Sequence, residues 1–544
     1  MTSASTTTRR TLGILAGTAA FALILTGCAA GDGDNAGDTG DGSILVGTTD
    51  KVTTLDPAGS YDNGSFAVQN QVFPFLMNSP LGSPDVEPDI AVSAEYTAPK
   101  DYTVTLKPDL KFANGNDLTA SDVKFTFDRQ FAIAADNGPS SLLYNLESTE
   151  AVDDTTVVFH LKAENDQVFP QILSTFPGAI VDEEVFSATE LTPDEDIVAG
   201  NAFAGQYSIK SYDFNATIEF VPNEAYQGLL GPAENKSVIL SYYSDSSNLK
   251  LDVQEGNIDV AYRSLSSTDV EDLRGDDDVV VHDGPGGEIR YIVFNFDTQP
   301  YGLKSEDPDA EKALAVRQAA ADLIDRDEIA DQVYKGTYTP LYSFVPDGFT
   351  GATEVLKDLY GDGAGAPDAA KAKATLEAAG VELPVQLSLQ YNSDDHYGPS
   401  SGDEYALVKS QLEADGLFAV DLQSTEWVQY SKDRVADVYP AYQLGWFPDY
   451  SDADNYLTPF FLKENFLANH YDNPEVNDLI LEQGVTVDPD ARTAIIEDIQ
   501  AKVGADLSTI PLLQGAQIAV SGADIEGLEL DASFKFRFAT LVKG

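Results

Sequence analysis

An aspartate flanked by aromatic residues is the side chain of this sequence best suited to hold a cationic group. Asp449 lies in the segment Trp446-Phe-Pro-Asp-Tyr450. Aromatic neighbours keep water from a carboxylate, so its attraction to an ammonium group is screened less than at an open surface. The alternative is a solvated loop acid, the usual environment of an aspartate. The segment alone leaves both interpretations open: a solvated acid, or a binding site for an amine-bearing ligand, which needs only a few such polar groups.

A second segment, Gly398-Pro-Ser-Ser-Gly402, matches the G-x-S-x-G pattern of serine hydrolases. In those enzymes the serine lies on the turn directly after a strand, and an aspartate and then a histidine follow later in the chain. Here the predicted strand ends near Tyr391, Pro399 precedes Ser400, and His470 is the only later histidine. We therefore expect a loop ahead of a helix. A secreted serine hydrolase built on Ser400 stays the less favoured alternative.

The sequence lacks the motifs that are typical of metal-binding and nucleotide-binding sites. The 4 histidines are scattered and the 1 cysteine lies near the N-terminus, so no metal-ligand spacing is formed. The acidic runs 276–278 and 449–454 lack the glycine and glutamate positions of an EF-hand loop, and we interpret them as solvated turns. No Walker loop occurs, so we expect no ATP hydrolysis by this chain itself. We expect no catalytic residue, no bound metal and no cofactor.

Acidic charge dominates the composition. The 544 residues include 32 Lys and Arg against 90 Asp and Glu, a formal net charge of −58. Such a surface repels nucleic acid and offers anionic lipid no basic face. With 43% hydrophobic and 10% aromatic residues, the chain is nevertheless globular rather than disordered. Its length exceeds a single hydrophobic core, so we expect two or three domains.

The N-terminus carries an export signal. Arg9 and Arg10 precede the uncharged apolar run 12–25, and Leu25-Thr-Gly-Cys28 follows. Basic charge, a short apolar core and small residues at a cleavage site are typical of a secretory signal. The residues ending at Cys28 resemble a bacterial lipobox, in which the cysteine is lipidated and becomes the first mature residue. The paired arginines leave general and twin-arginine export both open.

We therefore expect a lipoprotein signal peptide at residues 1–27, and a lipidated Cys28 with a flexible tether at residues 28–42. Beyond the signal no stretch of 18 apolar residues occurs, so we expect no other membrane span. The protein would then be exported and held by its lipid on the outer face of the cell membrane.

From Ser43 onward, strand and helix patterns alternate without long gaps, which is typical of α/β lobes. The predicted elements are a strand over 102–106, a helix capped by Thr119 and Asp122, one helix over 311–334 ending at Gly336, a helix over 368–379, and strands over 385–391 and 419–423 around a helix near 404–414.

A series of short motifs in a fixed order carries a family resemblance. The motifs are Thr54-Leu-Asp-Pro57, Pro88-Asp-Ile-Ala91, Lys111-Phe-Ala-Asn-Gly115, Leu118-Thr-Ala-Ser-Asp-Val123, Gly256-Asn-Ile-Asp259, Val316-Arg-Gln-Ala319 and Gly445-Trp-Phe-Pro-Asp-Tyr450. Together they resemble the family-5 extracellular solute-binding proteins, the peptide-binding components of ABC importers. The resemblance covers essentially Ser43 to the C-terminus.

The resemblance implies an α/β fold with two lobes, the class II flytrap of periplasmic binding proteins, and an additional small inserted domain. We expect lobe I at residues 43–70, 185–285 and 515–544, the small domain at 71–184, and lobe II at 286–514. Closure of two lobes around a ligand is a known switching mode.

The resemblance also implies which residues touch the ligand. Asp449 would capture the peptide amine, and the backbone of Gly445, Trp446 and Phe447 would pair with the peptide. Relatives often carry a cation shortly before the tryptophan, where this chain has Gln443 and Leu444.

Further candidates lie elsewhere in the chain. The opposite lobe would contribute the loop with Tyr61, Asn63 and Gly64, which reads equally well as a plain surface turn. His396 is a candidate for the peptide carboxylate, and Arg434 is a weak substitute for the missing cation.

The resulting expectation is a monomeric, lipid-anchored receptor that captures peptides and delivers them to a membrane permease served by an ATPase. A receptor of the same fold for another solute, such as a metal chelate, a sugar or an opine, remains an alternative. No nucleic acid is expected as a partner.

Overall fold

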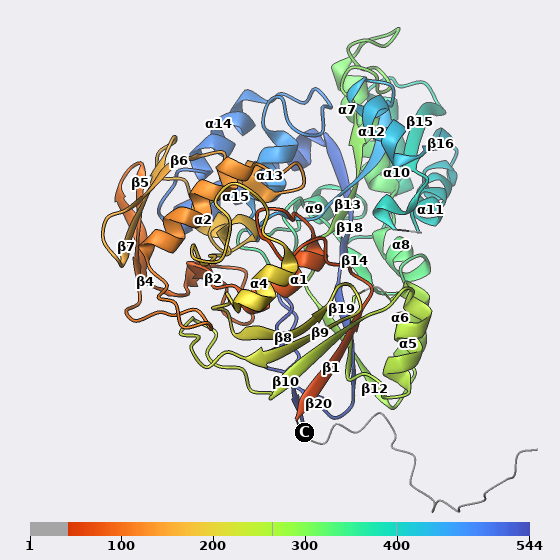
Figure 1. Ribbon diagram of the computed structural model, residues 1–544. Helices are drawn as coiled ribbons and strands as arrows, with labels where there is room; N and C mark the ends of the chain where they lie inside the picture. Colours follow the sequence, from red (N-terminus) through yellow and green to blue (C-terminus); the bar gives the residue numbers. More distant parts are fainter. Residues whose placement is uncertain (1–41, 264, 399) are drawn as a thin grey trace, which may run out of the picture. The chain divides into compact units, whose positions relative to one another are not determined.

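The computed structural model describes residues 42–263, 265–398 and 400–544 (Figure 1). The predicted signal peptide, Cys28 and all of the tether except Gly42 lie outside the described residues. Within the described part, the helices are all too short or too polar to cross a bilayer.

The first large sheet has seven strands in the order β12-β19-β11-β1-β10-β9-β8. β1 runs parallel to β10 and β11, and the other neighbours are antiparallel. Helices α5 and α6 flank this sheet (Figure 1). The strands are β1 Ser43–Thr48, β8 Tyr207–Asp213, β9 Thr217–Pro222, β10 Ser237–Tyr242, β11 Val260–Tyr262, β12 Val279–Gly284 and β19 Gln517–Gly522, and the helices are α5 Ser246–Gln254 and α6 Ser267–Leu273.

The second large sheet has six strands in the order β14-β18-β13-β17-β15-β16. Its strand β13 is buried along its whole length, because the elements around it cover both faces. The strands are β13 Ile289–Phe294, β14 Tyr338–Pro340, β15 Val385–Asn392, β16 Phe418–Thr425, β17 Ala441–Trp446 and β18 Thr509–Gly515. The helices of this part are α7 Ala310–Leu323, α8 Arg326–Gln332, α9 Val355–Leu359, α10 Ala369–Ala378, α11 Ser401–Glu413, α12 Trp427–Val435, α13 Asp454–Phe461, α14 Pro474–Gln483 and α15 Pro489–Asp506, with a 3-10 turn at Asp395–Tyr397.

A third, smaller unit has its own core around a four-stranded antiparallel sheet in the order β4-β5-β7-β6. Helix α2 packs against β6 and β7. The elements are β4 Ala91–Ala98, β5 Asp101–Leu106, α2 Ala120–Ile133, β6 Leu146–Ala151, β7 Thr156–Leu161 and α3 Phe169–Ile172, with 3-10 turns at Pro139–Leu143 and Phe176–Gly178. The remaining elements are α1 Asn63–Val72, β2 Met77–Asn78, β3 Glu87–Pro88, α4 Asp194–Gly200, β20 Ile525–Glu526 and β21 Val542–Lys543.

In the described residues the chain passes between the two large sheets at two places, from β12 to β13 and from β18 to β19. These two crossings touch each other. The Gly515 amide donates to the Glu288 carbonyl at 2.8 Å. A Cβ atom on Gly286 would lie 1.7 Å from the Gly515 carbonyl oxygen, so only glycine fits there.

Most of the local predictions are confirmed. Thr119 and Asp122 form a capping box at the start of α2, and β5, α10, α11, β15 and β16 lie where they were expected. The single helix predicted over 311–334 is wrong. The chain becomes extended at Ile324. The Asp325 side chain then accepts a hydrogen bond from the Glu328 amide at 2.9 Å, and a new helix, α8, begins. An N-cap aspartate inside an apolar stripe thus divides it in two.

Candidate ligand-binding site

Asp449 follows strand β17 and is partly buried. The Tyr61 hydroxyl donates to its Oδ1, and Asn455 Nδ2 donates to its Oδ2 at 3.3 Å. The Thr175 hydroxyl donates to the Asp449 carbonyl at 3.1 Å. Within the described residues this carboxylate has no cationic partner. Burial raises its pKa, an effect that the hydrogen bonds from Tyr61 and Asn455 only partly offset.

Asn455, in the first turn of α13, fixes the geometry around Asp449. Its Oδ1 accepts from Trp446 Nε1 at 2.9 Å and from the Asp449 amide at 3.0 Å. Its Nδ2 is the donor to the carboxylate described above. One buried amide therefore orients the indole, the backbone and the acid of the same segment, which prepares the carboxylate for a ligand.

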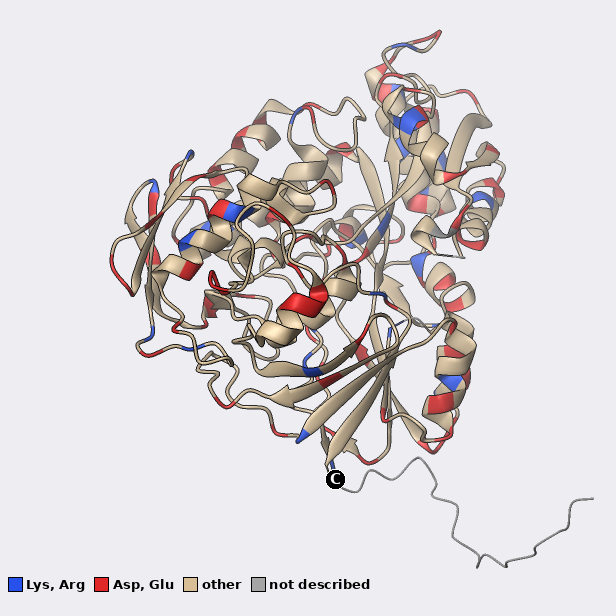
Figure 2. Ribbon diagram, in the orientation of Figure 1, with Lys and Arg blue, Asp and Glu red and all other residues tan. Residues whose placement is uncertain are grey.

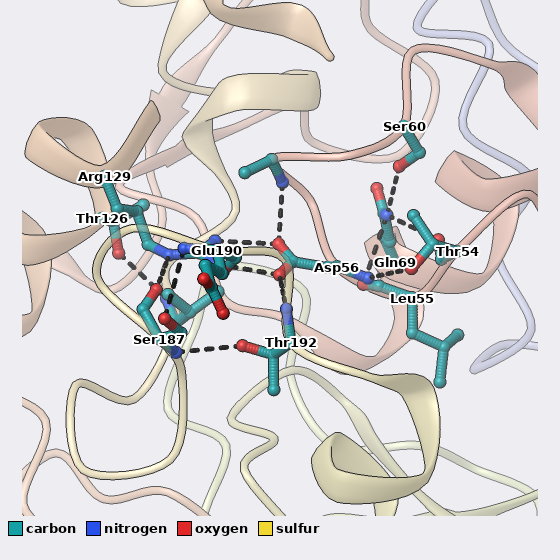
Figure 3. Close-up of polar contacts among 12 residues, drawn as sticks. Thr54, Leu55, Asp56, Ser60, Gln69, Thr126, Arg129, Ser187, Glu190 and Thr192 are labelled. Atoms are coloured by element: carbon teal, nitrogen blue, oxygen red, sulfur yellow. Dashed lines mark hydrogen bonds and ion pairs between the residues drawn. The ribbon is translucent and has the colours of Figure 1, made fainter. Parts of the chain in front are cut away.

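An ion pair at Asp56 holds the base of the loop that carries Tyr61 (Figure 3). Arg129 of α2 donates from Nη1 and Nη2 to the two Asp56 oxygens, each at 2.8 Å. The amides of Ala58 and Thr192 donate to the same carboxylate at 2.9 and 2.8 Å. Both side chains are almost fully buried. The loop is thus fixed at its base, while the Tyr61 ring contacts Phe176 edge-on at 4.9 Å between ring centroids.

A cavity of about 750 Å³ opens beside this segment. Its lining comes from both large sheets and from the two crossings between them, and includes Arg263, Glu288, Arg290, Tyr338, Tyr397 and Phe447. Phe447 and Phe534 also line a small pocket of about 40 Å³ that includes Asp449. The acid and the large cavity are therefore neighbours, separated by aromatic rings.

Arg290, on β13, is a cation of this cavity that is held by protein partners. Its Nη1 donates to Glu404 at 3.4 Å, and its Nη2 donates to Glu288 and to the Tyr338 hydroxyl at 3.2 Å each, and to the Tyr397 carbonyl. Its side chain is 4% exposed. We conclude that Arg290 mainly fixes the cavity wall.

Comparison with known proteins decides the family. The profile of the bacterial extracellular solute-binding proteins, family 5, matches residues 85–467. The chain belongs to this family. Its fold is the two-lobed α/β fold of periplasmic binding proteins with an additional small domain.

Among relatives of this family-5 protein, the probable D,D-dipeptide-binding periplasmic protein DdpA of Escherichia coli K12 is 25% identical over 89% of this chain and 90% of its own. The dipeptide-binding protein DppE of Bacillus subtilis is 24% identical over 93% and 94%. The structure of HbpA2 from Haemophilus parasuis superimposes with a TM-score of 0.79 at 19% identity, covering 92% of this chain and 100% of that one.

The structure of this family-5 protein brings several predicted residues together. Tyr61 contacts Asp449. Gly445 and Trp446 end strand β17, and Phe447 follows them on the way to Asp449. Trp446 is half-buried, with its ring against Phe460 and Phe466, whereas Phe447 is 37% exposed at the cavity.

The other two residues of the Tyr61 loop differ in their surroundings. Asn63 lines the small pocket beside Asp449. Gly64 is buried against the backbone, since a Cβ there would lie 2.0 Å from the Lys51 carbonyl oxygen, so it serves the packing of α1.

His396 and Arg434 lie apart from this group. His396 stacks on Trp427 with ring centroids 3.6 Å apart, and partial burial lowers its pKa, so the imidazole is uncharged near neutral pH. Arg434 is 5% exposed and donates from Nη1 to the carbonyls of Phe466 and Leu467, each at 2.9 Å. This geometry favours a structural role for Arg434 over contact with a ligand.

Ser400 precedes helix α11 and lines the large cavity. Among the described residues, its hydroxyl has no hydrogen bond to a histidine. The expected loop ahead of a helix is confirmed.

Sequence reasoning missed the polar residues of the large cavity. Arg263 directly follows β11, Glu288 lies in the crossing from β12 to β13, and Arg290 lies on β13. The glycines at 284, 286 and 287 were the available signal, because clustered glycines mark a close approach of backbones next to a site.

Proposed function

We propose that this family-5 protein is the extracellular receptor of an ABC importer, and that it captures peptides in a cleft between its lobes and delivers them to a membrane permease. The observation that carries the proposal is Asp449, a partly desolvated carboxylate whose protein partners are a hydroxyl and an amide, with no cation among the described residues. A peptide ammonium supplies the missing charge. The names of the relatives DdpA and DppE, which refer to dipeptides, support the same ligand class.

In this proposal the ammonium takes the place of the Tyr61 hydroxyl against Asp449, and Asn455 keeps the carboxylate in position. Strand β17 pairs with β15 only at Ala441 and Tyr442. On that side, beyond these pairs, the backbone of Gly445, Trp446 and Phe447 pairs with the peptide main chain, as an added strand does. The lobes that close on it are residues 43–70, 185–285 and 515–544 on one side and 286–514 on the other, with 71–184 as the inserted domain.

The proposal includes binding without catalysis. The members of the family are solute-binding proteins, and Ser400 has no histidine partner in the described part of the chain. Labelling with a fluorophosphonate probe is the direct check, and we expect no labelled serine.

Asp449→Asn tests the role of the acid, because it keeps the side-chain shape and deletes the charge. Removal of one partner of a buried charged pair costs about 3–5 kcal/mol, so the affinity for free peptides should fall at least about a hundredfold. Calorimetric titration with a mixed peptide pool measures this, and the same pool after N-acetylation should bind the parent weakly and lose little more in the variant. Asp421→Asn, an exposed acid on β16, is the matched control and should leave binding unchanged.

Equal losses for free and acetylated peptides would show that Asp449 does not hold the amine. If the parent binds no peptide at all, a metal chelate, a sugar or an opine becomes the better ligand class. Mass spectrometry of the ligand that copurifies with the protein distinguishes these classes directly.

We also propose that the protein acts as a monomer held to the outer face of the cell membrane by a lipid on Cys28. The support is the sequence pattern around Cys28, which resembles a lipobox. Cys28→Ala should release the protein from the membrane fraction of the producing cells, and an unchanged distribution would contradict the anchor. Sedimentation of the released protein measures its oligomeric state.

A further inference from the structure

A second cavity, of about 330 Å³, lies where helix α3 of the small unit meets helices α14 and α15, and we call it the interface cavity. Its volume is in the range of small-molecule sites. Hydrogen bonds join its two sides: the Gln167 amide donates to the Gly484 carbonyl at 3.0 Å, and the Thr350 hydroxyl donates to Asp85 Oδ1 at 3.2 Å. Among the described residues, none lines both this cavity and the large one.

Gln171, in α3, is a polar residue of the interface cavity whose side chain is left without a partner. It lines the cavity and is only 7% exposed. Its side-chain amide group has no hydrogen-bond partner among the described residues. Because a buried amide that bonds to nothing is unfavourable, native proteins seldom contain one without a reason. The group is therefore available to a molecule that enters this cavity.

The free charge of the interface cavity is negative. Its arginine, Arg492, donates to both Asp452 oxygens at 2.8 and 2.7 Å, and to the side-chain and main-chain carbonyls of Gln483 at 3.0 and 3.2 Å. The carboxylate of Asp85 is exposed and, in the described part of the chain, accepts only from Thr350. Acidic residues are also spread over the helices and loops of the whole chain, whose net charge is −58 (Figure 2). The cavity thus favours a group that donates hydrogen bonds and disfavours an anion.

The interface cavity adjoins the acid that we assign to the ligand amine. Ser451 lines this cavity and also the small pocket that includes Asp449. From the small unit, the Thr175 hydroxyl donates to the Asp449 carbonyl at 3.1 Å, and the Ser174 hydroxyl donates to the Gln171 carbonyl at 2.9 Å. A peptide whose ammonium contacts Asp449 therefore has the interface cavity next to its first residue.

We propose that the interface cavity takes the side chain of the first peptide residue, and that Gln171 and Asp85 select a long side chain that donates hydrogen bonds, such as glutamine, lysine or arginine. The inference rests on the proposed function and names the class of peptide that the site prefers. The donor binds Gln171 Oε1 and the Asp85 carboxylate. An acidic side chain is rejected because it faces Asp85 with the same charge, and an apolar one leaves the Gln171 amide group unpaired.

Four tripeptides test this preference. They share the ending Ala-Ala and begin with Gln, Lys, Leu or Glu, which are side chains of similar length. In calorimetric titrations of the full-length protein, we expect the Gln and Lys peptides to bind about tenfold or more tightly than the Leu and Glu peptides. One extra alanine at the N-terminus moves the variable residue to the second position, and the preference should then disappear. Equal affinities for the four tripeptides, or a preference that survives this shift, overturn the inference.

Two variants assign the preference to its residues. Gln171→Leu should remove most of the preference for Gln over Leu, and Asp85→Asn should reduce the preference for Lys over Glu. Gln386→Leu, at an exposed glutamine on β15 that does not line the cavity, is the matched control and should change neither. Thermal melts verify that all variants are folded. An undiminished preference for Gln over Leu in Gln171→Leu overturns the inference and leaves the proposed function intact. If the parent binds none of the peptides, the proposed function fails, and the interface subsite fails with it.

Discussion

Asp56 and Asp449 are both shielded from bulk water, but their carboxylates differ in the charge of the groups that donate hydrogen bonds to them. Asp56 is fully buried and receives two hydrogen bonds from Arg129 and two from backbone amides. Asp449 is partly buried and receives its hydrogen bonds from the neutral groups of Tyr61 and Asn455. The carboxylate that stabilises the fold is paired with a cation of the protein itself. In our proposal the carboxylate of the binding site is paired with a cation of the ligand.

Of the two carboxylates, Asp56 should have the larger effect on stability when it is substituted. Asp56→Asn leaves the guanidinium of Arg129 buried without a charged partner, so the free energy of unfolding should decrease by about 3–5 kcal/mol. Urea denaturation followed by circular dichroism measures it. The double variant with Arg129→Met removes the stranded charge and should recover part of the loss. A decrease below about 1 kcal/mol for Asp56→Asn would mean that the pair contributes little, as exposed pairs do.

Asn455→Ala tests whether the Asp449 segment is oriented by one amide. The variant leaves Trp446 Nε1 and the Asp449 amide without their acceptor, so we expect a destabilisation of about 1–3 kcal/mol. Peptide affinity should fall as well, because the carboxylate loses its orientation. Asn257→Ala, at an exposed asparagine outside this segment, is the matched control and should leave the affinity unchanged. Unchanged affinity in Asn455→Ala would show that Tyr61 alone positions the acid.

The charge of Asp449 should destabilise the empty protein at neutral pH. Burial raises its pKa above the ordinary value of 3.8, so the folded state binds the proton more tightly than the unfolded state does. Stability therefore decreases as the pH rises through the interval between these two pKa values. Asp449→Asn should raise the urea midpoint at pH 7, and this gain should vanish below pH 3.8. A gain that is the same at both pH values would contradict the assignment, and Asp421→Asn provides the baseline.

A smaller change is expected from Tyr61→Phe. The hydroxyl competes with the ligand ammonium for Asp449, so its removal should increase peptide affinity by about three- to tenfold, the value of one hydrogen bond. Calorimetry at constant pH measures the change. A loss of affinity would mean that the Tyr61 hydroxyl contacts the bound peptide instead of giving way to it.

The smallest expected effect is a shift of the intrinsic tryptophan fluorescence on ligand binding. Trp446 belongs to the Asp449 segment, whereas Trp427 stacks on His396 away from it. Addition of a peptide pool should shift the intrinsic fluorescence, and Trp446→Phe should abolish most of the shift. If Trp427→Phe abolishes it instead, the ligand binds elsewhere.

Local sequence patterns were sufficient for many elements, and they pointed to Asp449, one half of the proposed site. The alternation at 102–106 and the Thr119–Asp122 cap depend on near neighbours, and the aromatic segment identified Asp449 from residues next to it. The contact of Tyr61 with Asp449 joins positions 388 residues apart. The contact of Arg263 with the ring of Phe447 likewise joins residues that follow strands of different sheets. Such contacts form when distant segments of the chain pack together, so they cannot be predicted from a local sequence pattern.

The two crossings between the large sheets touch at Gly286 and Gly515, and both glycines also line the large cavity. If the lobes rotate about these two connections, the hinge is also part of the cavity wall that a ligand would contact. A ligand in the cavity would then contact directly the backbone segments that set the angle between the lobes. A permease that senses that angle can tell a loaded receptor from an empty one without touching the cargo.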